Sequence, residues 1–486
     1  MGTTPTKLDS SNTNLVLKQL KSGKSIKHIK GLQSNSASPT DTWIIYFLPE
    51  VINYERKFLS NVFCKISISS KTVRSPHHLD EAIGLEYEMQ VYNGIIKNIL
   101  SNHVCKYFVN CYNVFSECTF EDLYEILIND RDINPEIIKK NLIRNIYYIY
   151  EGIENRPSII NQSPHFHFSS PDIEKILSQL RFNIVMTENI KDKSFTFSEF
   201  IRKFANTDPV NRNIYEAHFW ILYLQVALAC YTFQLHKCAH NDLHTGNIFI
   251  SPHNRKIIQV VQVNGLKHFV RTSFDCKLYD FDRAYVEKFG KNDYLSLFCK
   301  EYNQCNTVSD NLDFIKFSCY FFSSDLESNL TNKILGCICR KEEMFDKVKE
   351  IFESCSMTKF KPDFDYKYFF PIEQIIKNIS KHIPDIFEEP KKDELMILQD
   401  DVWVIDRNFF KDGLLNVEKQ QKNVFDLKNE YDMKRQELLK RKKEENEEKE
   451  KEEEFSRPLK KSRNYDGKIK RRSFKKKVKQ ITSKKK

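Results

Sequence analysis

Two acidic residues and one asparagine stand at positions where they could do chemistry together. Asp242 lies in the polar loop 240–250, Asn247 follows it five residues later, and Asp280 ends a second apolar run. A carboxylate can accept a proton, and carboxylate and amide oxygens are ligands for Mg²⁺. Because ordinary packing does not explain this set, the sequence predicts a catalytic site here.

The elements around these residues predict a rigid scaffold for them. An apolar helical segment, residues 217–235, leads into the loop, and the loop ends in a β-branched and aromatic run typical of a strand. Two strand-like runs between Ile250 and Lys277 predict a lengthened hairpin. Such a hairpin leaves Asn247 and Asp280 adjacent in space.

The sequence motifs around Asp242 and Asp280 resemble those of a known enzyme family. The loop 240–250 fits the kinase catalytic-loop pattern H-x-D-L-x-x-x-N, and Asp280-Phe281-Asp282 stands in place of Asp-Phe-Gly. With the later segment Leu312-Asp313-Phe314 and the strand-forming insert between the motifs, the chain resembles the divergent serine/threonine protein kinases of large DNA viruses (the poxvirus and giant-virus group). The resemblance covers roughly residues 30–330. It implies an α+β, bilobal protein-kinase-like fold with a small β-rich N-lobe and a larger helical C-lobe.

The resemblance also implies a role for each residue. Asp242 would accept the proton of the substrate hydroxyl, and Asn247 and Asp280 would hold Mg²⁺, with Asp282 assisting. The implied cofactors are ATP and Mg²⁺, or Mn²⁺ in its place. Asp313 is expected to anchor the catalytic loop, with Asp310 as the alternative.

A lysine and a glutamate extend the predicted site. Residues 61–68 alternate like a strand, and Lys65 among them resembles the kinase lysine that orients the α- and β-phosphates. Residues 79–100 show helical spacing and carry both Glu86 and Glu88. Glu88 is the expected ion-pair partner of Lys65, and Glu86 is the alternative.

The predicted nucleotide contacts are less specific. Segment 31–38 has one glycine, Gly31, with small residues such as Ser34 and Ser36 that let backbone N–H groups approach phosphates. An ordinary surface loop is an equal interpretation. Residues 181–188 predict the strand before the hinge, so backbone groups from Glu188 to Ile190 are expected to bind adenine.

The sequence leaves three classes of function open. His244 occupies the position where protein serine/threonine kinases usually carry a lysine, and the same loop form occurs in choline and aminoglycoside kinases. The leading hypothesis is transfer of the γ-phosphate to Ser or Thr hydroxyls of proteins, and the alternative is a small-molecule phosphotransferase. The third is a pseudokinase scaffold that binds nucleic acid, against which the intact set Lys65, Asp242, Asn247 and Asp280 argues.

Composition predicts the organisation of the 486 residues. We expect a disordered N-terminus over 1–13, an N-lobe over 14–187 with a helical insertion at about 120–180, and a C-lobe over 188–416 whose later part is helical. Residues 417–486 are expected to form a charged helix and a basic, disordered tail. The helix is expected to be solvated rather than a coiled coil, because Gln420 and Lys434 are polar.

The distribution of charge along the chain bears on its partners and location. Residues 457–486 hold 15 Lys or Arg against the single acid Asp466, so this segment has a net charge of +14. Since the whole chain has a net charge of +10, the remaining residues have a net charge of −4. This tail predicts a nuclear-localisation or nucleic-acid-binding patch, or a solvated tail without a specific partner. The segment after Met1 fits the pattern for N-myristoylation of Gly2.

The 13 scattered cysteines predict small buried hydrophobic side chains in a reducing compartment, and neither structural zinc nor a disulfide framework. The sequence shows no apolar run of membrane-spanning length and no signal-peptide core. A soluble intracellular protein is therefore expected, in the host cytoplasm or virion for a viral protein, with the nucleus as the location that the basic tail suggests.

Overall fold

The computed structural model describes residues 26–32, 41–47, 61–72, 76–122, 178–188, 190, 194–297, 299, 305–322, 326–354 and 368–456. The architecture is mixed α/β. The chain divides into two units, residues 1–433 and 434–486. The first unit contains all the elements that concern the candidate site.

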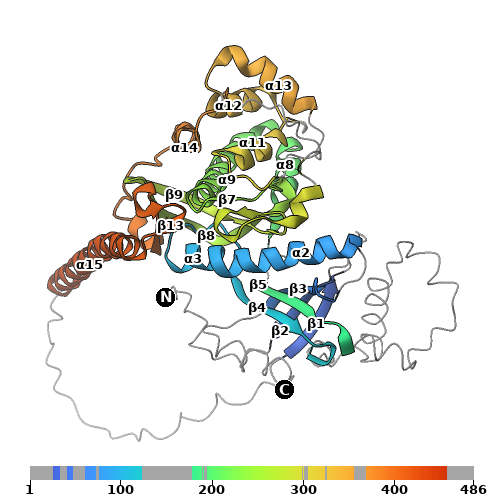
Figure 1. Ribbon diagram of the computed structural model, residues 1–486. Helices are drawn as coiled ribbons and strands as arrows, with labels where there is room; N and C mark the ends of the chain where they lie inside the picture. Colours follow the sequence, from blue (N-terminus) through green and yellow to red (C-terminus); the bar gives the residue numbers. More distant parts are fainter. Residues whose placement is uncertain are drawn as a thin grey trace, which may run out of the picture. The chain divides into compact units, whose positions relative to one another are not determined.

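The first part of this unit forms an antiparallel sheet of five strands, in the order β1-β2-β3-β5-β4 (Figure 1). Its strands are β1 (Ile26–Leu32), β2 (Asp41–Phe47), β3 (Asn61–Ile68), β4 (Cys111–Cys118) and β5 (Phe182–Glu188). Alternating and β-branched residues predicted the central strands β3 and β5, and both predictions are confirmed. Lys65 on β3 pairs with Val185 on β5, so the lysine lies in the middle of the sheet.

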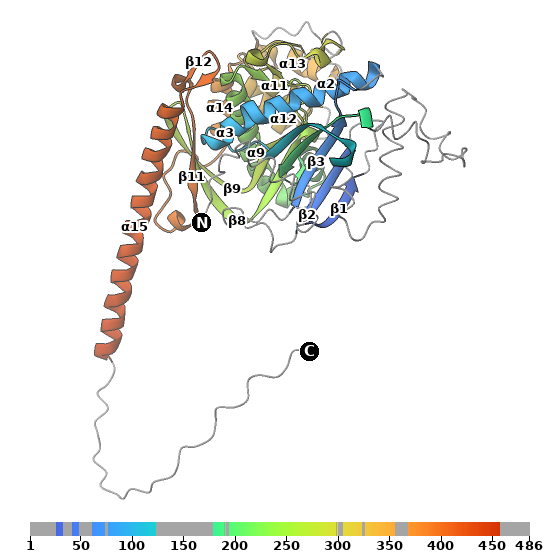
Figure 2. The same ribbon diagram turned by 60° about the horizontal axis from the view of Figure 1, so that its bottom comes forward.

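The helix predicted over 79–100 is present and begins slightly earlier. It consists of α2 (Pro76–Val91), one π-helical turn η1 (Tyr92–Ile96) and α3 (Lys97–Ser101). Its apolar face is buried, and α2 contacts β3 and β5 (Figures 1 and 2). Single π-helical turns are frequent near functional sites because they change which side chains face a neighbour.

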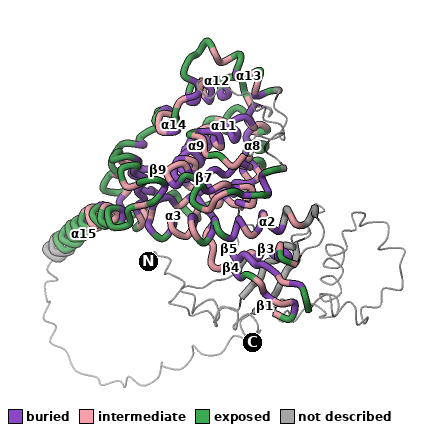
Figure 3. The backbone as a smooth tube through the Cα atoms, viewed as in Figure 1, coloured by how far each residue is buried: buried purple, intermediate pink, exposed green. Residues whose placement is uncertain are grey.

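The long helix before the catalytic-loop motif is α9 (Pro209–Leu235). Asp208 caps its N-terminus, because its carboxylate accepts hydrogen bonds from two backbone N–H groups of the first turn. Pro209 is the first helical residue, where its fixed φ angle suits the helix. Much of α9 is buried, and it contacts α8 (Phe197–Ala205) (Figure 3). The loop that follows is therefore preceded by a long helix with 13 buried residues.

After the loop, the chain forms the predicted long hairpin. Strand β8 (Ile248–Val263) pairs antiparallel with β9 (Leu266–Leu278). Between them Asn264 and Gly265 both have positive φ angles, which a two-residue hairpin turn of the right twist requires. The short strand β6 (Phe195–Thr196) adds to one part of β8.

One strand of this second sheet was not expected. Residues 328–416 were predicted to be helical, but β11 (Leu398–Ile405) pairs in parallel with β8. The prediction is wrong there because a short buried run rich in Val and Ile fits a strand as well as a helix, and the long edge of β8 provides its backbone partners. Before the final helix, the other α-helices and strands of the described residues are β7 (Cys238–Ala239), β10 (Tyr285–Val286), α11 (Leu312–Cys319), α12 (Ser328–Ile338), α13 (Phe345–Ser354), α14 (Ile372–Ser380), β12 (Phe410–Lys411) and β13 (Leu414–Leu415).

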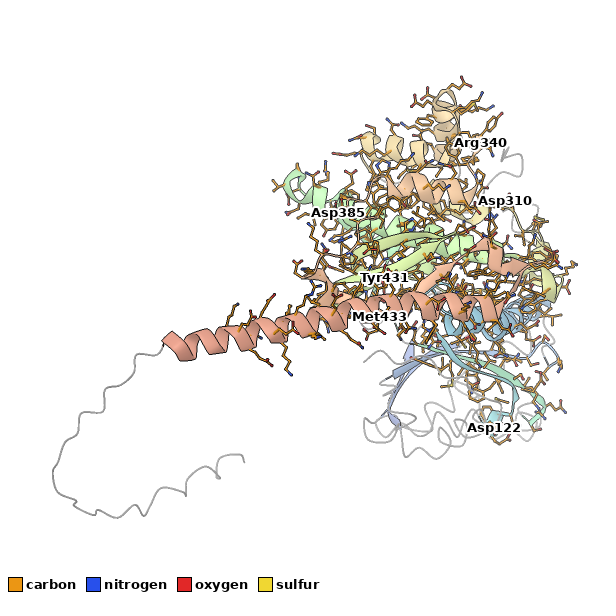
Figure 4. The ribbon with its side chains drawn as sticks, turned by 90° about the vertical axis from the view of Figure 1, so that its left-hand side faces the viewer. Asp122, Asp310, Arg340, Asp385, Tyr431 and Met433 are labelled. Atoms are coloured by element: carbon orange, nitrogen blue, oxygen red, sulfur yellow. A yellow bond between two sulfur atoms is a disulfide. The ribbon has the colours of Figure 1, made fainter. Side chains whose placement is uncertain are left out.

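The final helix is α15 (Val417–Ser456). The prediction of a solvated helix is wrong for its first part, where Gln420, Leu427 and Tyr431 are buried. The Gln420 amide donates to three backbone carbonyls, so this polar side chain can be buried with its donor group satisfied. Figure 4 labels Tyr431 together with Met433, which is exposed. Residues 434–456 of α15 belong to the second unit.

The cysteines agree only in part with expectation. Of the ten described cysteines that do not form a disulfide, eight are buried. Cys299 and Cys305, however, form a disulfide within one short segment, which the scattered spacing did not indicate. Among the described residues, no helix combines the length and apolar character needed to cross a membrane.

Candidate active site

Lys65 joins two distant parts of the chain. Its Nζ lies 2.8 Å from Oε2 of Glu88 on α2 and 2.8 Å from Oδ1 of Asp280, which follows β9. The Lys65–Glu88 ion pair expected from the sequence is therefore present. The Glu88 side chain is buried, whereas the Asp280 side chain is 32% exposed and accessible to a ligand.

Glu86, the alternative partner, has a different role. Its carboxylate accepts hydrogen bonds from the N–H and hydroxyl of Ser70 and from the amide of Asn183. It thus ties α2 to the ends of two sheet strands. Because Glu86 and Glu88 are two residues apart, they lie on different sides of the helix, and only Glu88 reaches Lys65.

Lys65, Glu88 and Asp280 change the pKa values of one another. Burial by itself lowers the pKa of Lys65, but the carboxylates of Asp280 and Glu88 hold it well above its ordinary value. Burial raises the pKa of Glu88, and Lys65 opposes that effect. Burial also opposes ionisation of Asp280, but Lys65 brings the pKa of Asp280 below its ordinary value. Lys65 is therefore a fixed cation between two acids.

Asp280 adopts a left-handed backbone conformation, with φ of +66°. Few residues other than glycine take this conformation, and Asp is one that tolerates it. The next residue, Phe281, is fully buried, with its ring 5.1 Å from those of both Tyr92 and His240. The N–H of Phe281 donates to Glu88. The turn therefore buries the phenylalanine and brings the acid to Lys65.

The loop that carries Asp242 is fixed from α11. The carboxylate of Asp313 accepts hydrogen bonds from the N–H of His240 at 2.7 Å and from that of Asn241 at 2.8 Å. Asp313 is thus the anchor, as expected, and Asp310 instead accepts a bond from Gln234 on α9. The His240 ring bonds through Nε2 to the carbonyl of Tyr279, just before Asp280.

Asn247 lies between the two acids. Its Nδ2 donates to the backbone carbonyl of Asp242, and its own carbonyl accepts from the N–H of Tyr279. The hairpin thus brings Asn247 to Tyr279, the residue that precedes Asp280. Since Nδ2 is used as a donor, Oδ1 of Asn247 is the atom that could ligate a cation.

Asp282 is a further acid beside Asp280. Burial and the charge of Asp280 raise the pKa of Asp282 to about 8, so this acid is largely protonated at neutral pH. Within the described ranges no group of three or more His, Cys, Asp or Glu side chains is placed to hold a metal ion.

Arg283 was not singled out from the sequence. Its Nη1 lies 3.2 Å from Oδ2 of Asp242, and its carbonyl accepts a hydrogen bond from Asn241. The sequence signal that could have indicated Arg283 was its position three residues after Asp280.

His244 also lies in the loop that carries Asp242. Its Nδ1 accepts a hydrogen bond from the N–H of Gly246, and burial lowers the pKa of the imidazole.

The predicted nucleotide contacts are described only in part. Gly31 lies within β1, paired with Trp43 of β2, whereas Ser34 and Ser36 fall outside the described residues. The N–H of Glu188 donates to Asn110, and its side chain bonds to Lys277. An adenine contact from Glu188 would therefore use its carbonyl oxygen.

Other predicted features lie outside the described residues: Gly2, most of the insertion at 120–180 and the basic tail 457–486. A comparison of the chain with models of known protein families found no match, and a search of curated proteins also found none.

Proposed function

We propose that this chain is an ATP- and Mg²⁺-dependent protein kinase that transfers the γ-phosphate to Ser or Thr hydroxyls of proteins. The observation that carries the proposal is the contact of Lys65 with both Glu88 and Asp280, beside the loop of Asp242 and Asn247. The proposal includes a bilobal kinase-like fold, with the five-stranded sheet and α2 as the N-lobe and the part built on α9 as the C-lobe.

Each residue has a chemical task in this proposal. Lys65, fixed between two carboxylates, would bind the α- and β-phosphates as a point charge. Asn247 and Asp280 would hold Mg²⁺, with Asp282 beside them. The bound ion would neutralise the charge of the phosphates. Asp242 would orient the acceptor hydroxyl and accept its proton, although positioning contributes more than basicity when the transition state is loose.

The anchoring of the loop supports such a task. Catalysis by positioning requires that the acid stays within a few tenths of an ångström of its place. Asp313 fixes the backbone just before Asp242, and Asn247 fixes the carbonyl of Asp242 itself. Together they restrain both sides of the acid.

The test uses the full chain with γ-labelled ATP and Mg²⁺, and offers basic and acidic proteins as acceptors. We expect labelled Ser or Thr with the wild type and none with Asp242→Asn. If ATP is consumed and no protein is labelled, a small-molecule acceptor replaces the protein substrate. If ATP does not bind, the chain is a pseudokinase and the proposal is wrong.

A further inference from the structure

A guanidinium group lies beside the proposed catalytic acid. Arg283 places Nη1 3.2 Å from Oδ2 of Asp242, and both side chains are partly exposed, at 28% and 21%. The Arg283 backbone is held by Asn241, whose Nδ2 donates to its carbonyl at 3.1 Å. Since Asn241 directly precedes Asp242, the arginine and the acid are fixed by the same stretch of loop.

The loop itself offers no comparable cation. Two residues after Asp242 stands His244, whose Nδ1 accepts a hydrogen bond from the N–H of Gly246 at 3.0 Å. A ring nitrogen that accepts is not protonated, so this imidazole is neutral. The other nearby cation, Lys316, is buried and bonded to the carbonyl of Asn241. Of these groups, Arg283 combines a permanent charge, partial exposure and contact with Asp242.

A fixed cation beside Asp242 could stabilise the phosphoryl group during its transfer. The charge of the phosphoryl group spreads over three oxygens, and positive charge fixed in advance near those oxygens stabilises the transition state. A guanidinium has five N–H donors in one plane, so it can bond to the carboxylate of Asp242 and to a phosphoryl oxygen at once. The Lys65 ammonium has three N–H donors and bonds to Glu88 and Asp280, which leaves one donor for the phosphates of the nucleotide.

We propose that Arg283 is a further catalytic residue, whose guanidinium binds the transferring phosphoryl group while it orients Asp242. This inference rests on the proposed kinase function and assigns to Arg283 the charge that residue 244 lacks. The bond between the γ-phosphorus and the β–γ bridging oxygen breaks, ADP leaves with the electron pair, and the phosphorus bonds to the acceptor oxygen. The proton of the acceptor hydroxyl goes to Asp242, and Arg283 takes part through hydrogen bonds alone.

The test measures kcat and the KM for ATP of the full chain, with the best acceptor found for the wild type. Arg283→Met is expected to lower kcat by about 10³-fold, in line with other arginines that contact a transferring phosphoryl group, while KM for ATP changes by less than about 3-fold. The matched control is Arg407→Met, because Arg407 is a more exposed arginine paired with Glu373 outside the site. The control is expected to keep the wild-type kcat.

A double variant separates charge from structure. If Arg283 supplies charge to the phosphoryl group, His244→Lys in the Arg283→Met protein restores kcat at least about 10-fold. A residue that only orients Asp242 would not be replaced in this way. If Arg283→Met does not fold, Arg283→Lys is used instead and is expected to lower kcat about 10-fold or more, because the lysine lacks the planar fork.

The outcomes separate the two proposals. A wild type that transfers phosphate, with Arg283→Met or Arg283→Lys within about 3-fold of its kcat, overturns the role of Arg283 and leaves the kinase function standing. Loss of kcat in Arg283→Met with no restoration by His244→Lys also overturns it. A wild type that transfers no phosphate to any acceptor removes the proposed function first, and this inference with it.

Discussion

Nζ of Lys65 lies 2.8 Å from Oδ1 of Asp280, although 215 residues separate the two in sequence. The contact links the five-stranded sheet to the turn after the β8–β9 hairpin. Lys65 is bonded to Glu88 at the same distance, so the lysine connects helix α2 to the turn. The predictions below follow from this arrangement and from the elements that hold it.

Glu88→Gln should impair phosphate transfer, and Glu86→Gln should not. Loss of one charge-assisted hydrogen bond to Lys65 is worth about 1.5–3 kcal/mol, which corresponds to about 10- to 100-fold in kcat/KM. Glu86 bonds to Ser70 and Asn183, so Glu86→Gln should lower thermal stability instead. Steady-state kinetics and thermal unfolding of both variants check this prediction. Equal loss of kcat/KM in both would contradict it.

Stability without metal should decrease with rising pH because of Asp282. The pKa of this acid is raised from 3.8 to about 8 by burial and by Asp280. Between those values the folded protein holds a proton that the unfolded chain has released, so the free energy of unfolding falls as pH rises. Urea unfolding in EDTA at pH 6 and pH 8 should show a smaller fall for Asp282→Asn. An identical fall in both proteins would refute the assignment.

Asp313→Ala should destabilise the loop of Asp242. The change leaves the N–H groups of His240 and Asn241 without their carboxylate partner, at a cost of about 2–4 kcal/mol. The control is Asp310→Asn, which removes one charge from an exposed contact with Gln234 and should change stability by less than about 0.5 kcal/mol. Figure 4 labels Asp310. Denaturant titration measures both, and similar losses would remove Asp313 as the anchor.

Gln420→Leu should destabilise the first unit by about 1–3 kcal/mol, because three backbone carbonyls lose the hydrogen bond from its amide, although that of His103 keeps a second donor, the N–H of Val404. These carbonyls belong to Asn102 and His103 after α3 and to Val404 on β11. Lys422→Ala, an exposed position on the same helix, should stay within about 0.5 kcal/mol. Chemical unfolding of the two variants and the wild type is the measurement. A neutral Gln420→Leu would mean that α15 does not support α3.

The sequence predicted the elements whose patterns are local. Strand β3, the helix with Glu88, helix α9 and the hairpin all follow from spacing and from flanking residues. The pairing of Lys65 with Glu88 also followed, because it needed one strand and one helix in the expected order.

The sequence did not predict contacts that depend on three-dimensional placement. Gln420 looked solvated because its type is polar, and only the carbonyls around it show why it is buried. Arg283 looked like an ordinary charged residue, because its partner Asp242 is 41 residues away in sequence. Strand β11 needed the edge of β8 as its partner, which no local pattern encodes.

The most direct test of the account is the rate of γ-phosphate transfer from Mg-ATP by Asp242→Asn at the same ATP occupancy as the wild type. The account predicts that the variant binds ATP as the wild type does and that its transfer rate falls by at least about 10²-fold. An unchanged rate at equal ATP occupancy would contradict the central claim, because Asp242 would then have no part in the chemistry.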